Sequence, residues 1–321
     1  MVGREKLTAF ARYAWLVLGW NLLVILWGVF LRASKSGDGC GQHWLTCQGE
    51  VIPSAPQLKT IIEYSHRITS FLAFVSVVVL VIWTVRRFAK GSPIRRTAVL
   101  SLVFVVTEGL VGAGLVLTGN TADTLTAARP FWMAGHLINT FILLAFLTLT
   151  ARYAGGGSRV SFLHEPKALV AIAAGALAVF IVGITGSIAA LASMLFPSGT
   201  LSEGLAADLS STSHTLLRLR LLHPIIAILT SVLLIFTTSW LSKVAKDAAT
   251  KRWANILALL VVGQLAFGAA TLLTLAPIVM QLGHLFLADA IWISYVLLTA
   301  NFLALTGLRV AEIAGSDRDV P

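Results

Sequence analysis

Residues 61–85 read IIEYSHRITSFLAFVSVVVLVIWTV, and this segment sets the architecture of the whole chain. Its apolar part is long enough to cross a lipid bilayer as a helix, which takes about 20 residues. His66 stands near its start, and Glu63 precedes it by one helical turn. Ionisable side chains inside a bilayer are costly and usually functional. We therefore interpret the segment as a membrane helix that carries a functional histidine near one membrane face.

Comparable apolar runs recur along the chain. The sequence is 57% hydrophobic and only 12% charged, a composition typical of membrane proteins with many spans. We predict an all-α polytopic membrane protein whose eight transmembrane helices lie near residues 13–31, 61–85, 97–118, 131–151, 168–190, 216–241, 254–275 and 283–308.

Positive charge is confined to alternate connections between these runs. The net charge of +10 would suit a nucleic-acid partner, but its distribution follows the positive-inside rule instead. We therefore predict no nucleic-acid partner, both termini in the cytoplasm, and a bacterial cytoplasmic membrane. The basic clusters are Arg4, Lys6 and Arg12; Arg86, Arg87, Lys90, Arg95 and Arg96; Arg152, Arg159 and Lys167; and Lys243, Lys246, Lys251 and Arg252.

The runs divide into two sets of four with similar features. In each set the first span leads into a long outer loop (32–59 and 191–215), and the second and fourth spans begin near a histidine. An even number of spans gives both halves the same orientation, which favours parallel repeats. We predict two four-helix bundles, 1–154 and 168–321, joined by a cytoplasmic linker at 155–167 that contains a flexible Gly-Gly-Gly-Ser segment.

Histidines lie at matching depths in four of the predicted helices. Twenty residues separate His66 from Arg86, and the same number separates His223 from Lys243. At about 1.5 Å of rise per residue this is roughly 30 Å, close to the thickness of the hydrocarbon core. Four imidazoles at one depth favour two pairs of axial heme ligands. The pairs are His66 with His136, and His223 with His284; His43, His164 and His214 fall in loops and are interpreted as solvated or locally bonded.

Charged residues near the same membrane face complete the predicted sites. Glu63 shares a helix face with His66, where it would suit proton transfer; a structural ion pair with Arg67 is the alternative. The matching position of the second half, three residues before His223, is Arg220. This difference suggests chemistry in the first half and electron transfer in the second. Candidate contacts for heme propionates, which guanidinium groups bind in forked pairs, are Arg67, Arg129, Arg218 and Arg220; interfacial snorkelling is the alternative for each.

Several motifs resemble those of the heme A synthase family. These are residues 36–49, SGDGCGQHWLTCQG, with 62–67, IEYSHR, and the shorter matches 135–140, GHLINT, and 281–285, QLGHL. The resemblance covers nearly the whole chain and is to the form with a cysteine pair, Cys40 and Cys47, in the first outer loop. Both cysteines lie on the predicted outer side, where a disulfide is permitted. A loop closed by it would form a cap over the first-half site.

The resemblance implies a function and a role for each motif. Members oxidise a methyl group of heme O to a formyl group, giving heme A for terminal oxidases. It implies that Glu63 is catalytic, that His66 and His136 ligate the heme O substrate, and that His223 and His284 ligate a resident heme b. Heme O, the lipid bilayer, an electron acceptor and the heme O synthase that supplies the substrate are the expected partners. Pro224, which follows His223 where Arg is expected in several members, is expected to kink the sixth span.

Two other functions share part of this pattern. A diheme b-type cytochrome that exchanges electrons with quinone would need the four histidines but not Glu63 or the cysteine loop. A carrier of heme or of a lipid would need neither catalysis nor permanent binding; the chain has no nucleotide-binding loop, so ATP-driven transport by this chain alone is excluded.

Overall fold

The computed structural model describes residues 7–162 and 166–316, with side chains placed up to residue 305. In these residues it consists of helices and loops, and eight helices are long and apolar enough to cross a membrane. The prediction of an all-α membrane protein with eight spans is confirmed. The helices are α1 (Ala9–Ala33), α2 (Leu58–Arg87), α3 (Pro93–Leu117), α4 (Arg129–Ala154), α5 (Pro166–Leu195), α6 (Leu201–Leu209), α7 (Thr215–Arg220), α8 (Leu222–Ala245), α9 (Ala248–Leu273) and α10 (Ile278–Ser316).

Helix ends follow local sequence signals. Thr8 caps α1 by accepting a hydrogen bond from the backbone N–H of Ala11, and Asp247 caps α9 in the same way. These side chains satisfy N–H groups that have no partner within the helix. Prolines open α3 and α5, where the missing N–H costs nothing.

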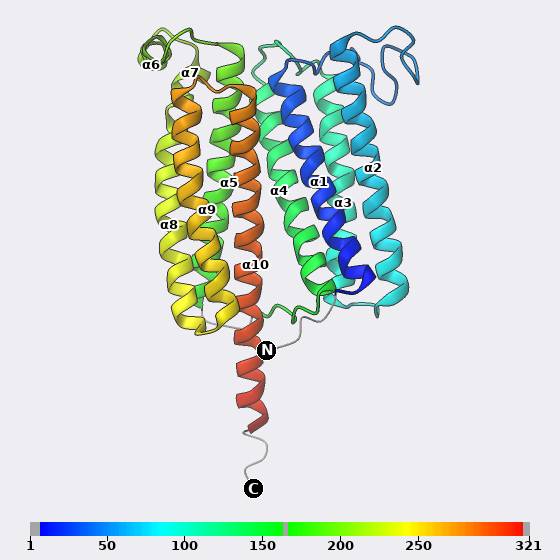
Figure 1. The fold of residues 1–321 in the computed structure, drawn as a ribbon, viewed down its shortest axis with the longest axis vertical. Coiled ribbons are helices and arrows are strands. Elements are labelled where there is room, and N and C mark those ends of the chain that lie inside the picture. The colour runs from blue at the N-terminus through cyan, green and yellow to red at the C-terminus, as the bar shows by residue number, and fades with distance from the viewer. Residues whose placement is uncertain (1–6, 163–165, 317–321) are drawn as a thin grey trace.

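The helices form two groups that meet along a shared seam (Figure 1). Helices α1–α4 pack among themselves, and so do α5, α8, α9 and α10. Contacts of α4 with α5, and of α10 with α1 and α4, join the groups. These contacts agree with the predicted halves, but the internal duplication and the domain boundaries stay predictions.

Polar and aromatic contacts hold the seam together. The indole N–H of Trp292 on α10 donates to the backbone oxygen of Phe141 on α4 at 2.6 Å. The rings of Phe141 and Phe180 both pack on Trp292. Nearer the other end, Nε of Arg152 donates to the side-chain oxygen of Asn301 at 2.9 Å. Hydrogen bonds of this kind, satisfied inside the protein, help to fix neighbouring helices at membrane depth.

Apolar side chains cover the outside of the helices as well as the inside. Leu16, Phe71 and Leu259 are largely exposed, which in water would mark an interaction surface but in a bilayer is the surface that lipid covers. The buried core includes Val77, Leu80, Leu144, Leu147 and Leu257.

One end of the bundle carries two elaborate connections. The α1–α2 loop contains the two cysteines, and the α5–α8 connection contains the short helices α6 and α7 (Figure 1). Helix α6 lies within the predicted loop 191–215, where the sequence analysis expected no helix. Thr200 and Glu203 form a capping box that starts it.

The predicted sixth span has a one-residue break near Pro224, at Leu221, which keeps helical backbone angles, so the expected kink stays a prediction. Helix α7 ends at Arg220 and α8 begins at Leu222. Pro224 has no N–H to donate to the carbonyl of Arg220, four residues earlier, so the helix cannot continue undisturbed through this point. The interruption lies just before His223.

Candidate functional site

His66 packs against a glycine on the neighbouring helix. A methyl group added at Gly28 on α1 would lie 3.0 Å from Cε1 of the His66 ring, so only glycine leaves room for the imidazole there. A hydrogen bond from the Trp27 indole to the Ser65 hydroxyl, 3.1 Å long, holds α1 and α2 together beside it. The Nδ1 atom of His66 is buried and has no hydrogen-bond partner among the described residues.

His136 lies against a carboxylate. Its Nδ1 atom is 3.0 Å from Oε1 of Glu108 on α3, although the ring is not turned to aim that N–H at the oxygen. Asn139 and Thr140, on the next turn of α4, donate side-chain hydrogen bonds to the two oxygens of Glu108. Both His136 and Glu108 are close enough to His66 to interact with it electrostatically. The structure therefore adds Glu108 as a neighbour of His136, and the pairing of His66 with His136 stays a prediction.

The predicted second-half pair is also brought together. The rings of His223 on α8 and His284 on α10 lie 6.2 Å apart between centroids and are nearly perpendicular, at 87°. Each ring again faces a glycine: a methyl group at Gly186 on α5, or at Gly268 on α9, would lie 2.9 Å from Cε1 of His223 or His284. The Thr185 hydroxyl lies 3.3 Å from Nδ1 of His223.

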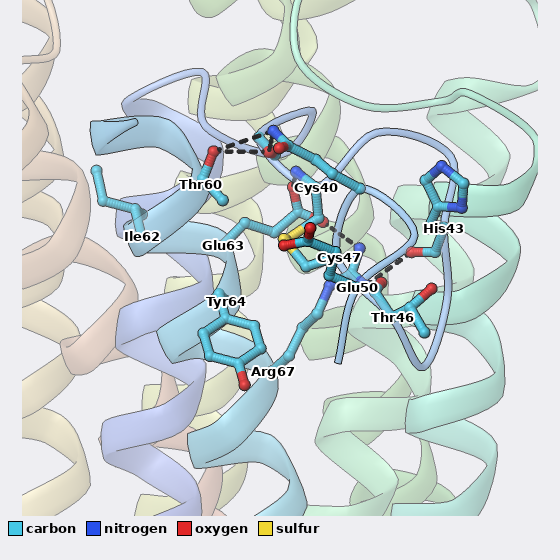
Figure 2. The surroundings of a disulfide bond; sticks show 12 residues. Cys40, His43, Thr46, Cys47, Glu50, Thr60, Ile62, Glu63, Tyr64 and Arg67 are labelled. Carbon is cyan, nitrogen blue, oxygen red and sulfur yellow. Dashed lines mark hydrogen bonds and ion pairs between the residues drawn. A yellow bond between two sulfur atoms is a disulfide. The ribbon is translucent and has the colours of Figure 1, made fainter. Parts of the chain in front are cut away.

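The Glu63 side chain is buried in the first turns of α2, and each of its two carboxylate oxygens has a partner (Figure 2). Its side chain is only 4% exposed and forms an ion pair with Arg67, one turn below. Its other oxygen accepts the backbone N–H of Cys40 at 2.8 Å. The structural ion pair that the sequence analysis gave as the alternative is therefore present. Glu63 links the histidine-bearing helix directly to the cysteine loop.

Cys40 and Cys47 form the expected disulfide, and the loop that it closes is bound to α2 from several sides (Figure 2). Arg67 donates to the backbone oxygens of His43 and Thr46, at 2.7 and 2.8 Å. The Thr60 hydroxyl donates to the backbone oxygen of Gly39 at 2.9 Å. The loop is thus fixed directly above the turn of α2 that carries His66.

The four arginines predicted to bind heme propionates differ in their present bonding partners. Arg67 is used by Glu63 and the loop, and Arg220 is paired with Asp208 of α6 at 2.6 Å. Arg218 makes only a long 3.5 Å contact with the Thr215 hydroxyl. Arg129 is 3% exposed, and its Nε has no hydrogen-bond partner within the described part of the chain.

A second arginine, which the sequence did not single out, lies near Arg129. Arg32, at the end of α1, is close enough to Arg129 for their charges to interact. It donates to the side-chain oxygen of Gln281 on α10 at 3.3 Å, and its Nε is also buried without a partner among the described residues. The sequence feature that could have indicated Arg32 is its position at the outer end of a predicted span.

The remaining histidines lie outside both pairs. His43 is exposed in the cysteine loop. His214 caps α7, with Nδ1 accepting the N–H of Leu216 at 3.2 Å, and its ring stacks on Phe196. Both agree with the predicted local roles. His164 falls outside the described residues.

The fold and these paired groups define a multi-pass helical membrane protein with two partly buried pairs of histidines. The sequence profile of the COX15-CtaA family, described as cytochrome oxidase assembly proteins, matches residues 11–296. The chain belongs to this family.

Individual relatives agree with this assignment. A "Heme A synthase" of Shouchella clausii is 31% identical over 267 residues, which are 79% of this chain and 83% of that protein. Another, from Halalkalibacterium halodurans, is 38% identical over 126 residues, 39% of this chain and 42% of the relative. A "Protoheme IX farnesyltransferase" of Thermus thermophilus is 45% identical over 300 residues. That match covers 94% of this chain, but the chain spans only about half, 49%, of the relative.

Proposed function

We propose that this chain is a heme A synthase, which oxidises a methyl group of heme O to a formyl group. The observation that carries the proposal is the presence of two histidine sites in a chain of this family, with a buried carboxylate, Glu63, three residues before His66 where Arg220 precedes His223. The family match and the relatives named heme A synthases support it.

The relative named as a farnesyltransferase does not favour prenyl transfer by this chain. The match leaves about half of that protein uncovered, so its name can describe the part that has no counterpart here. A farnesyltransferase acting on protoheme IX would supply the farnesylated heme that a heme A synthase consumes. We therefore propose heme O synthase as a partner.

The second-half pair fits a resident heme b. Iron held between two imidazoles, each at about 2.0–2.1 Å as in other metal–imidazole bonds, would place the ring centres roughly 6 Å apart, and the observed separation is 6.2 Å. The glycines facing His223 and His284 leave space for both rings. A heme bound there would supply one-electron transfer.

The first-half pair, His66 and His136, is proposed to hold the substrate. The methyl group is proposed to take a hydroxyl from one water to give an alcohol and a second hydroxyl from another water to give a hydrated aldehyde, each step releasing two protons and two electrons. The hydrated aldehyde then loses one water to leave the formyl group. Glu63 is proposed to accept protons, and electrons are proposed to leave by way of the second half to an acceptor. Arg129 and Arg218, which have free donors, are proposed to bind propionates, with Arg67 and Arg220 joining only if their present partners release them.

The propionate proposal for Arg129 is strengthened by Arg32. Two arginines whose charges interact, each with a buried Nε that has no hydrogen-bond partner among the described residues, favour an anionic ligand near them. Porphyrin propionates are anions of this kind.

The test is to extract and separate the hemes of membranes that contain the chain and a supply of heme O. Wild type is expected to yield heme A. Glu63→Gln, which keeps an oxygen to accept the Cys40 N–H but lacks the negative charge, is expected to yield little or none. Thr60→Val, which removes another hydrogen bond between α2 and the loop, is the matched control and is expected to keep most activity.

Two results would contradict the proposal. Normal heme A production by Glu63→Gln would remove the Glu63 charge from the mechanism. Heme B alone in wild type, with two reversible b-type hemes, would favour the diheme cytochrome.

A further inference from the structure

Glu108 touches the histidine of its own half, and so does its counterpart in the other half. Glu108 precedes Gly112 on α3 by four residues, and Gln264 precedes Gly268 on α9 by the same interval. The side-chain nitrogen of Gln264 lies 3.4 Å from Nε2 of His284 and donates to the backbone oxygen of His284 at 3.1 Å. In the first half, Oε1 of Glu108 lies 3.0 Å from the other ring nitrogen, Nδ1, of His136. The two sites therefore differ by a carboxylate in place of an amide.

The Glu108 carboxylate is held in place by two side chains of α4. Asn139 donates to one oxygen, and the Thr140 hydroxyl lies against the other. Asn139 is itself fixed, because its amide also donates to the backbone oxygen of Phe104 at 2.9 Å and its oxygen accepts from Thr107 at 2.6 Å. Donors to both oxygens favour a carboxylate, which only accepts hydrogen bonds. The network holds it beside Nδ1 of His136.

A carboxylate beside Nδ1 determines whether the opposite ring nitrogen, Nε2, carries a proton. A small rotation of the ring would aim the Nδ1–H at Glu108 and leave Nε2 unprotonated and available to iron. Histidine ligands are commonly oriented in this way by a carboxylate, which also makes the imidazole a stronger donor. A stronger donor and a nearby negative charge both stabilise ferric over ferrous iron.

We infer that Glu108 is a positioning residue that orients His136 toward the heme of the first half and lowers the reduction potential of that heme relative to the heme of the second half. The inference rests on the proposed heme ligation. It assigns a function to the difference between Glu108 and Gln264, and it makes the first half the more easily oxidised site, as the proposed reaction requires.

The test is a redox titration of the purified full chain with both hemes bound, followed by optical and EPR spectra. Glu108→Gln is expected to raise the midpoint potential of one heme and to change its ferric EPR signal, while the other heme is unchanged. Glu108→Asp, which keeps the charge, is expected to restore most of the wild-type potential. Gln264→Glu, the reciprocal variant, is expected to lower the potential of the other heme.

Each outcome decides the inference. Unchanged potentials in both Glu108→Gln and Gln264→Glu would overturn it. If Glu108→Gln fails to retain the first-half heme, Gln264→Glu still tests the effect of the charge. An unchanged midpoint potential of the second-half heme in Gln264→Glu would then overturn the inference. Heme A production with unchanged potentials would overturn this inference alone, whereas shifted potentials in a chain that makes no heme A would contradict only the proposed function.

Discussion

Three of the four paired histidines pack against glycines in the same way. His66, His223 and His284 each lie against a glycine of a neighbouring helix, at a distance that a methyl group would close to about 3 Å. Such glycines were readable in the sequence only as ordinary small residues of membrane helices. Their role depends on which histidine faces them, and that partner comes from a different helix.

Replacing Gly268 with alanine tests this packing. The added methyl group would lie 2.9 Å from Cε1 of His284, and an overpacked contact costs about 1–3 kcal/mol, which corresponds to roughly 5- to 150-fold weaker retention of heme. We expect the heme b content of the purified protein to fall, measured by its absorbance spectrum. Gly263→Ala, on the same helix with open space at its Cβ, is the control. Equal heme content in the two variants would contradict the account.

The cysteine loop acts as one element with the start of α2. Its disulfide spans seven positions, and closing so short a loop contributes about 2–3 kcal/mol in the chain-entropy model. Glu63, Thr60 and Arg67 bind the loop to α2 at the level of the first-half site. The second-half histidines belong to other helices, α8 and α10.

Replacing both cysteines with serine should therefore affect the halves unequally. We expect heme A formation to fall several-fold because the loop above His66 loosens, while the heme b of the second half stays bound. Heme extraction measures the first quantity, and the reduced-minus-oxidised spectrum of the purified protein measures the second. Complete loss of heme b from the double variant would be inconsistent with the loop acting only on the first half.

The long connections with the disulfide and with α6 and α7 lie at one end of the molecule, and a set of basic helix ends lies at the other (Figure 1). Arg86, Arg87 and Arg152 lie in the last turns of helices that begin at the end with the disulfide loop (Figure 1). By the positive-inside rule the basic end faces the cytoplasm. The cytoplasmic position of the termini follows as a proposal.

Labelling of single cysteines tests this orientation. In a background without Cys40 and Cys47, we expect Ser211→Cys, beside α7, to react with a membrane-impermeant maleimide in intact cells. Lys90→Cys, in the α2–α3 connection, is expected to react only after the membrane is opened. Both native side chains are exposed, so a difference reflects the side of the membrane. The reverse pattern would invert the proposed topology.

At this scale the sequence predicted the spans well, because runs of apolar residues report membrane crossing directly. The predicted segment 61–85 lies within α2, Leu58–Arg87, and the segment 168–190 lies within α5, Pro166–Leu195. Helix α6 was missed because it is short and polar, although its Thr200–Glu203 capping box was a readable signal.

The site was predicted less completely than the spans. Matching depth and pairing within each half predicted the partners of the histidines, and the structure places the rings of His223 and His284 beside each other. Glu108 and Arg32 were missed because their partners, His136 and Arg129, lie on other helices. A single sequence gives the depth of a residue in the membrane but not which face of its helix meets which neighbour.

The most direct test of the proposed heme A synthase separates the two histidine pairs. His66→Leu and His223→Leu are each expressed with a heme O supply, and the hemes of membranes and purified protein are extracted and identified. We expect His66→Leu to keep a b-type heme and to make no heme A, and His223→Leu to lose the b-type heme. Heme A at the wild-type level from His66→Leu would contradict the assignment of the reaction to the first half.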